Sequence, residues 1–170
     1  MTTPHLRFET LIERYHDEIF RYLWRMLHAT PHEPQDMTQE TFIRAYQSFG
    51  RLRPGSNYRA WLYKIATNCA YSALRQHRHE TSLDDIEFHA AGDLSPDQQT
   101  IQNETLAAAG AIISQLPVKQ RAAVVMRHLQ GFEYAEIAQA LDCSEDSARA
   151  NVSQAVRRLR RELDRESGEA

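Results

Sequence analysis

The sequence has few of the residues that mark several classes of protein. It contains only two cysteines, Cys69 and Cys143, and neither lies in a Cys-x-x-Cys pair, so a disulfide framework is excluded and we expect both thiols to be reduced. Six glycines and six prolines in 170 residues exclude a collagenous or low-complexity chain. The longest nearly apolar run, residues 106–113, is far too short to span a bilayer.

Signals for export and for catalysis are also missing. The first residues show neither a basic leader nor an apolar stretch before a cleavage site, so we expect a cytoplasmic protein. His77, His79 and Glu80 lie close together, but the chain has no His-Glu-x-x-His motif, and a metal site is not expected. Because phosphate-binding glycine loops and nucleophile motifs are absent as well, we expect no cofactor and no enzymatic activity.

Charge is distributed unevenly along a chain whose net charge is only −3. Residues 51–79 hold six basic residues and no acid, whereas residues 80–104 hold seven acids and no Lys or Arg. Residues 131–148 carry a charge of −5, and residues 149–165 hold six arginines against two acids. Two basic surfaces therefore flank an acidic connector.

Apolar residues recur at spacings of three and four, and no segment alternates with a period of two, so the sequence predicts an all-α protein. We expect an N-terminal domain over residues 1–79, an acidic linker over 80–100, a C-terminal domain over 101–165 and a fraying tail over 166–170. Helices are expected at about residues 8–27, 34–50, 58–77, 101–116, 118–129 and 134–141, and from 145 onward. The third of these should bury Trp61, Leu62, Ile65, Ala66, Cys69 and Ala73.

Residues 133–161 form the sharpest local pattern, a short helix, a turn of about three residues and a second helix. Ser144 is placed to cap the second helix, whose apolar positions include Ala148, Val152 and Ala155. The arginines between these positions would be exposed, as in a helix-turn-helix that enters the major groove of DNA. The alternative is an ordinary C-terminal helix with a solvated charged face.

Residues 51–79 form a second candidate surface for nucleic acid. Lys64, Asn68, Tyr71, Arg75 and Arg78 would share one helix face, with two more tyrosines near its start. Cations beside aromatic rings suit single-stranded nucleic acid, because phosphates require charge and unstacked bases require a flat partner. The alternative is that the rings belong to the core or its rim and the charges confer solubility, and Trp61 in particular is interpreted as structural.

Three motifs, taken together and in order, resemble a known family. They are Asp-Met-Thr-Gln-Glu-Thr-Phe-Ile-Arg-Ala-Tyr at 36–46, Tyr-Arg-Ala-Trp-Leu-Tyr-Lys-Ile-Ala-Thr-Asn at 58–68, and Leu-Pro at 116–117 followed by Glu-Ile-Ala-Gln-Ala-Leu at 136–141. Together they resemble the extracytoplasmic-function sigma factors, a bacterial transcription initiation family. The resemblance runs from about residue 8 to residue 163. The resemblance implies a subunit that binds core RNA polymerase, directs it to promoters and helps to melt the −10 region.

The resemblance also implies a role for each surface. The polymerase's largest subunit would be bound by Asp36, Gln39, Glu40, Ile43 and Arg44. The −10 element, duplex and then melted, would be bound by Arg53, Ser56, Asn57, Tyr58, Tyr63, Lys64, Asn68, Tyr71, Arg75 and Arg78. The −35 duplex would be bound by Ser144, Ser147, Arg149, Asn151, Ser153, Gln154, Arg157, Arg158 and Arg160.

Further partners follow from the same resemblance: the flap of the second large polymerase subunit, and an anti-sigma factor as inhibitor. The linker would thread toward the RNA exit path. Residues 147–151, Ser-Ala-Arg-Ala-Asn, depart from the Thr-Val-Lys-Ser-Arg type that many relatives carry, so the −35 sequence is not predicted. A free-standing duplex-DNA regulator or a DNA-processing enzyme are the alternatives; the first leaves the 51–79 surface unexplained, and the second lacks a catalytic constellation.

Overall fold

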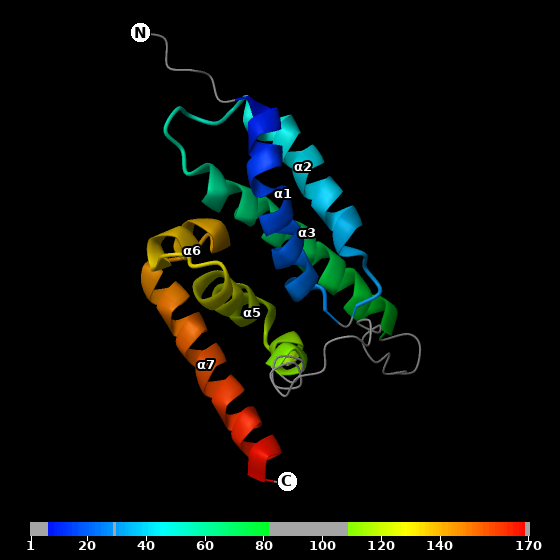
Figure 1. Cartoon of the computed structure of the whole chain (residues 1–170), viewed down its shortest axis with the longest axis vertical. Helices are drawn as coiled ribbons and strands as arrows, with labels where there is room; N and C mark the ends of the chain where they lie inside the picture. Colours follow the sequence, from blue (N-terminus) through cyan, green and yellow to red (C-terminus); the bar gives the residue numbers. More distant parts are fainter. Residues whose placement is uncertain (1–6, 29, 82–108, 169–170) are drawn as a thin grey trace.

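The computed structural model describes residues 7–28, 30–81 and 109–168, and every regular element in these ranges is helical. The first three are α1 (Phe8–Met26), α2 (Pro34–Phe49) and α3 (Tyr58–Thr81). After a helical segment at 109–115 come α5 (Val118–Val124), the wider π-helical turn η1 (Val125–Leu129), α6 (Tyr134–Leu141) and α7 (Glu145–Gly168). Figure 1 shows α1, α2 and α3 side by side, with the later helices beside them. The expected all-α fold is confirmed.

Helices α1, α2 and α3 pack around one apolar core. Leu11, Ile19, Leu23 and Met26 recur along α1 and are fully or almost fully buried, as the spacing of three and four predicts. Helix α2 begins at Pro34, whose missing N–H costs nothing in a first helical turn, and Gly50 follows its last residue.

The buried face of α3 differs in part from the expected one. Leu62, Ala66, Cys69 and Ala73 are buried as predicted, but Trp61 and Ile65 are only half-buried. Tyr63 is buried instead, because its ring lies 4.8 Å from that of Tyr22 and its hydroxyl donates to Glu18 Oε1 at 2.9 Å. The predicted buried face of α3 was therefore rotated too far toward Trp61. Its ring lies at the edge of the core, next to that of Phe49.

The C-terminal helices form the predicted helix-turn-helix. Gly131 takes a φ of +70°, a conformation that favours glycine, and the chain reverses there so that Phe132 enters the core. Asp142 also has a positive φ, of 52°, and makes the tight turn between α6 and α7. Ser144 then caps α7 by accepting the Ser147 N–H on Oγ at 3.1 Å, as the sequence predicted.

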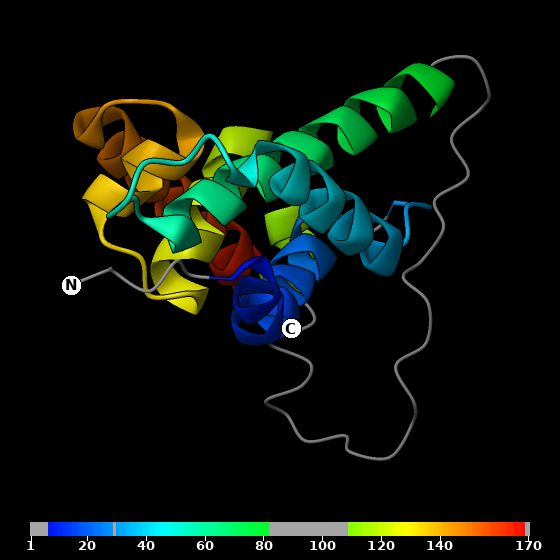
Figure 2. The same cartoon turned by 90° about the horizontal axis from the view of Figure 1, so that it is seen from above.

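The two groups of helices pack against each other. α6 lies beside the first turns of α3 in both orthogonal views (Figures 1 and 2). Arg121 of α5 is 6% exposed and its Nη1 donates to the Met26 carbonyl at the end of α1 at 2.6 Å. Its Nη2 donates to the Ser114 and Leu116 carbonyls, and burial lowers the pKa of this guanidinium.

The expected linker falls largely outside the described residues, as does the end of the tail. Helix α3 extends to Thr81, past its expected end at about residue 77. Within the described ranges, none of the helices combines the length and the apolarity that crossing a bilayer requires.

The Ser144 cap leads to a stability prediction. Ser144→Ala should lower the free energy of unfolding by about 1 kcal/mol, because one N–H at the start of α7 loses its acceptor. Ser144→Asp should keep most of the stability, since aspartate is an equally good cap. Urea unfolding followed by circular dichroism measures both, and equal losses in the two variants would contradict the capping role.

Candidate nucleic-acid and polymerase interfaces

The loop before α3 is held by its own side chains. Ser56 Oγ donates to the Arg53 carbonyl at 2.7 Å, and Gly55 has a φ of +83°. Asn57 Oδ1 accepts the Ala60 N–H at 3.0 Å, so Asn57 satisfies a free donor in the first turn of α3. This structural role was not predicted from the sequence, although an Asn directly before a helix is a known signal for it.

The predicted −10 residues follow the loop and α3, and they differ in exposure. Tyr58 is half-buried, with its ring 6.3 Å from that of Phe49. The exposed members are Arg53, Asn57, Asn68, Arg75 and Arg78, and the half-buried ones are Ser56, Tyr58, Lys64 and Tyr71. Burial raises the pKa of Tyr71 to about 12, so this phenol remains neutral at physiological pH.

Tyr63 lies apart from this exposed set. Its ring is fully buried between that of Tyr22 and that of Phe132, whose centroid is 4.5 Å away. Desolvation, reinforced by the Glu18 carboxylate, raises the pKa of its phenol far above the ordinary value. The expected stacking of Tyr63 on a base is therefore not available in this arrangement of the chain.

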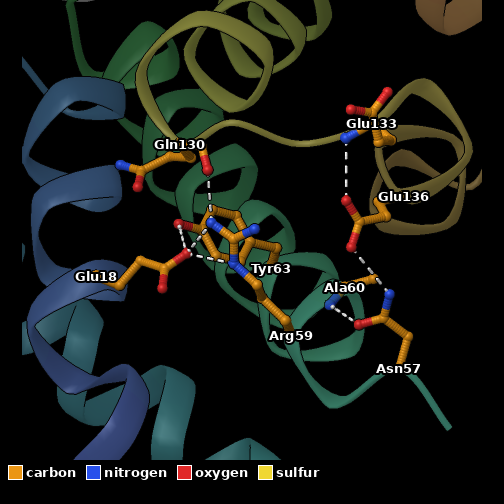
Figure 3. Close-up of polar contacts among 8 residues, drawn as sticks. All are labelled: Glu18, Asn57, Arg59, Ala60, Tyr63, Gln130, Glu133 and Glu136. Carbon is orange, nitrogen blue, oxygen red and sulfur yellow. Dashed lines mark hydrogen bonds and ion pairs between the residues drawn. The ribbon is translucent and has the colours of Figure 1, made fainter.

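Arg59, which the sequence analysis did not single out, joins three elements (Figure 3). Its Nε and Nη2 contact Glu18 Oε1 of α1 at 2.6 and 2.5 Å, and Nη2 also donates to the Gln130 carbonyl at 2.6 Å. Its guanidinium carbon lies 4.0 Å from the centre of the Phe132 ring. One cation thus connects α1 and α3 to the loop before α6.

Two further polar contacts join the start of α3 to α6 and the turn after it. Asn57 Nδ2 donates to Glu136 Oε1 at 3.2 Å, and Lys64 Nζ lies 3.7 Å from Asp142 Oδ1. Glu136 also closes a capping box at the start of α6 by accepting the Glu133 N–H, so its position is fixed by its own helix.

The predicted −35 residues lie along α7. Several of them already have partners in the protein: Arg149 lies over the Tyr134 ring at 4.5 Å, Asn151 donates to the Ser147 carbonyl, and Gln154 accepts from Gln120 at 2.9 Å. The exposed members are Ser144, Ser147, Arg149, Ser153, Gln154, Arg157 and Arg160, and the half-buried ones are Asn151 and Arg158.

The predicted polymerase-binding residues share the outer face of α2. Asp36, Gln39, Ile43 and Arg44 are exposed there, and Glu40 is half-buried and pairs with Arg44 one turn later. The same face presents apolar surface, since Ile43 is 53% exposed and borders a shallow groove with Ile12, His16 and Phe42. Tyr46, at 68% exposure, extends this face and was not among the predicted residues.

The described residues contain no group of three or more His, Cys, Asp or Glu side chains that could hold a metal ion. Cys69 and Cys143 are both free thiols, and burial raises the pKa of each. Both therefore remain protonated and weakly nucleophilic at physiological pH.

Comparison with known proteins identifies the chain. The model for sigma-70 region 2 matches residues 11–80, and a model for sigma-70 region 4 matches residues 106–159. The RNA polymerase sigma-H factor of Pseudomonas aeruginosa is 32% identical over 158 residues, which cover 87% of this chain and 81% of that protein. The ECF RNA polymerase sigma-E factor of Haemophilus influenzae is 30% identical over 158 residues, with 87% and 82% covered.

The chain belongs to the extracytoplasmic-function sigma factor family. Solved structures show the same fold: the sigma factor RpoE of Bartonella quintana, crystallised with the anti-sigma factor NepR, has a TM-score of 0.76 at 22% identity, with 92% of this chain and 96% of that chain covered. CnrH in complex with the cytosolic domain of CnrY has a TM-score of 0.68 at 20% identity, with 92% and 87% covered. In this sigma factor, the region 2 match covers α2 and nearly all of α1 and α3, and the region 4 match covers α5, η1, α6 and α7 up to residue 159.

Proposed function

We propose that this sigma factor binds core RNA polymerase, directs it to specific promoters and helps to melt their −10 region. The observation that supports this most strongly is the presence of both region matches, in order, in one chain. Each carries a basic exposed surface, on α3 and on α7. Neither surface has a catalytic constellation, and the relatives are named as sigma factors, so the chain acts by binding rather than by catalysis.

Docking on the polymerase would use the outer face of α2. Asp36, Gln39, Glu40 and Arg44 surround Ile43 there, which gives an apolar centre with a polar rim, the usual anatomy of a protein interface. A helical partner, such as the clamp helices of the largest subunit, would fit the groove between α1 and α2. Region 4 would at the same time contact the flap of the other large subunit.

At the −10 element, the loop 53–57 and the exposed face of α3 would hold the non-template strand. Arg75 and Arg78 would contact phosphates, while Asn57 and Tyr58 would contact an unpaired base. A base offers its face to a ring and its pairing edge to an amide only once it has left the duplex, so these two residues would favour the melted state.

At the −35 element, α7 would lie in the major groove. Arg149 is the candidate for reading a guanine, and Asn151 or Gln154 for reading an adenine. Arg157, Arg158 and Arg160, farther along α7, would anchor phosphates. Ser144 would contribute through its cap, which sets where α7 begins.

The remaining proposals concern partners and location. An anti-sigma factor is the expected inhibitor, since the sigma factor RpoE of Bartonella quintana was crystallised with one. The acidic segment 80–100 would act as a linker through the polymerase. Transcription requires the chromosome, so the chain would work in the cytoplasm.

Reconstituted transcription tests the main proposal. Core bacterial polymerase plus this protein should give discrete runoff transcripts from genomic DNA, with start sites that share −35 and −10 sequences. Core polymerase alone should give none. If the protein alone footprints duplex DNA and adds no specific transcripts to any intact core, it is a free-standing regulator instead.

A second experiment separates melting from capture at the −10 element. Tyr58→Ala should reduce open complexes by about one to two powers of ten, the equivalent of ~1–3 kcal/mol of base stacking, and change duplex capture little. Asn57→Ser should act in the same direction while it keeps the α3 cap. Permanganate reactivity of the −10 thymines measures opening.

Two controls complete this test. A premelted bubble should rescue both variants, because the opening step is then bypassed. Arg75→Ala should instead weaken capture and reduce its salt dependence, since phosphate contacts form with closed and open DNA. Failure of the bubble to rescue Tyr58→Ala would contradict a role in opening.

A third experiment concerns the −35 element. Arg149→Ala should relax the preference at one base pair by ~1–3 kcal/mol, whereas Arg157→Ala should weaken binding to all sequences about equally. Holoenzyme affinities for a set of single-base promoter variants measure both. An unchanged base preference in Arg149→Ala would show that this arginine does not read a base.

A further inference from the structure

The contact between regions 4 and 2 covers the start of α3, where the proposed −10 surface begins. Asn57, Tyr63 and Lys64 each contact region 4, through Glu136, Phe132 and Asp142 respectively. A base or phosphate at these positions would meet α6 and the loop before it. This arrangement therefore excludes DNA from part of the surface that the promoter requires.

Arg59 is the centre of this contact. Its neighbours Arg51 and Arg53 are exposed, whereas the Arg59 side chain is 25% exposed and has two partners in region 4, the Gln130 carbonyl and the Phe132 ring. Glu18 orients the guanidinium from the opposite side at 2.5 Å. A planar cation that donates in its plane and stacks on a ring satisfies all three partners at once, which lysine could not do.

We propose that Arg59 latches the free sigma factor in a closed, DNA-excluding state, and that release of this latch uncovers the −10 surface. The proposal rests on the proposed function, because it takes the start of α3 as the DNA-binding face. Affinity for single-stranded DNA is then reduced by the fraction of molecules that are closed. Core polymerase, which must hold regions 2 and 4 at separate promoter elements, would favour the open state.

In the proposed open state, the interface would separate at this end. The Lys64 and Asp142 side chains are 43% and 84% exposed, so this ion pair adds little. The buried Arg121 contact to the Met26 carbonyl lies eight residues farther along α1 than Glu18, about 12 Å at the rise of a helix. The end of the interface at Arg121 would remain in place while α6 moves away from α3.

The test compares Arg59→Met with Arg51→Met in the full chain. Both variants lose one positive charge, but Arg51 is exposed, has no described contact with region 4 and lies outside the proposed DNA-binding set. Spin labels on cysteines placed at the exposed positions Ser72 and Gln139, with Cys69 and Cys143 replaced by alanine, report the distance between α3 and α6. A fluorescent, mixed-sequence single-stranded DNA reports access to the −10 surface.

We expect the Arg59→Met chain to gain a longer-distance population and to bind the single strand up to about tenfold more tightly, because its open fraction rises. Arg51→Met should keep the parent distance and bind equally or more weakly. The gain is diagnostic, since loss of a cation alone weakens DNA binding. Phe132→Ala should act in the same direction from the region 4 side, and thermal melting confirms that each variant is folded.

Two results would overturn the proposal. If Arg59→Met and Phe132→Ala both keep the parent distance distribution, Arg59 is not a latch, whatever the transcription assay shows. If the variants open but do not bind the single strand more tightly, closure does not block a DNA-binding face at the start of α3. Runoff transcription with the unaltered chain and core polymerase tests the proposed function separately.

Discussion

The arrangement of the described helices depends on the side chains that compensate the negative charge of the Glu18 carboxylate. Its side chain is 19% exposed, and a carboxylate removed this far from water requires both charge and hydrogen bonds. Arg59 supplies the charge, and Tyr63 supplies a hydroxyl at 2.9 Å. Because both residues belong to the first turns of α3, Glu18 fixes the rotation of α3 against α1. The remaining Arg59 donor then captures the Gln130 carbonyl, so the same residue also orients region 4.

This constraint places the start of α3 both in the helix junction and in the proposed −10 surface. Asn57 caps the helix with its oxygen and contacts Glu136 with its nitrogen, so both ends of one amide are occupied. Tyr63 is the link between the Tyr22 ring and the Phe132 ring. A surface that binds DNA must offer free polar groups, whereas a stable helix junction must satisfy them. The proposed closed and open states would meet these two demands in turn.

Local signals in the sequence located the described helices, although α3 extends four residues beyond its expected end at 77 and the expected helix 118–129 changes into the π-helical turn η1 at Val125. Pro34, Gly131 and Ser144 act on their own neighbours, and the spacing of apolar residues reports a helix face within a few turns. The contacts of Arg59 were not predictable in this way, because its partners lie 41 and 71 residues away and one of them is a backbone carbonyl, which no side-chain pattern reveals. The same limit explains why the burial of Tyr63 was not predicted. The spacing of apolar residues located the buried face of α3 to within one position, but the contact with the distant Glu18 determines which ring lies inward.

One signal for the interdomain contact was nevertheless present in the charges. Residues 131–148 carry five acids and no base, and residues 51–79 carry six bases and no acid; Asp142 of the first segment and Lys64 of the second face each other in the structure. Region 4 thus covers the basic start of α3 with acidic side chains, as a nucleic acid would with phosphates. A DNA strand carries a denser line of negative charge than α6 does, so it would compete for the same cations with a stronger field. In the proposed closed state, region 4 would lower access to the −10 surface while the cations of α3 still attract the strand.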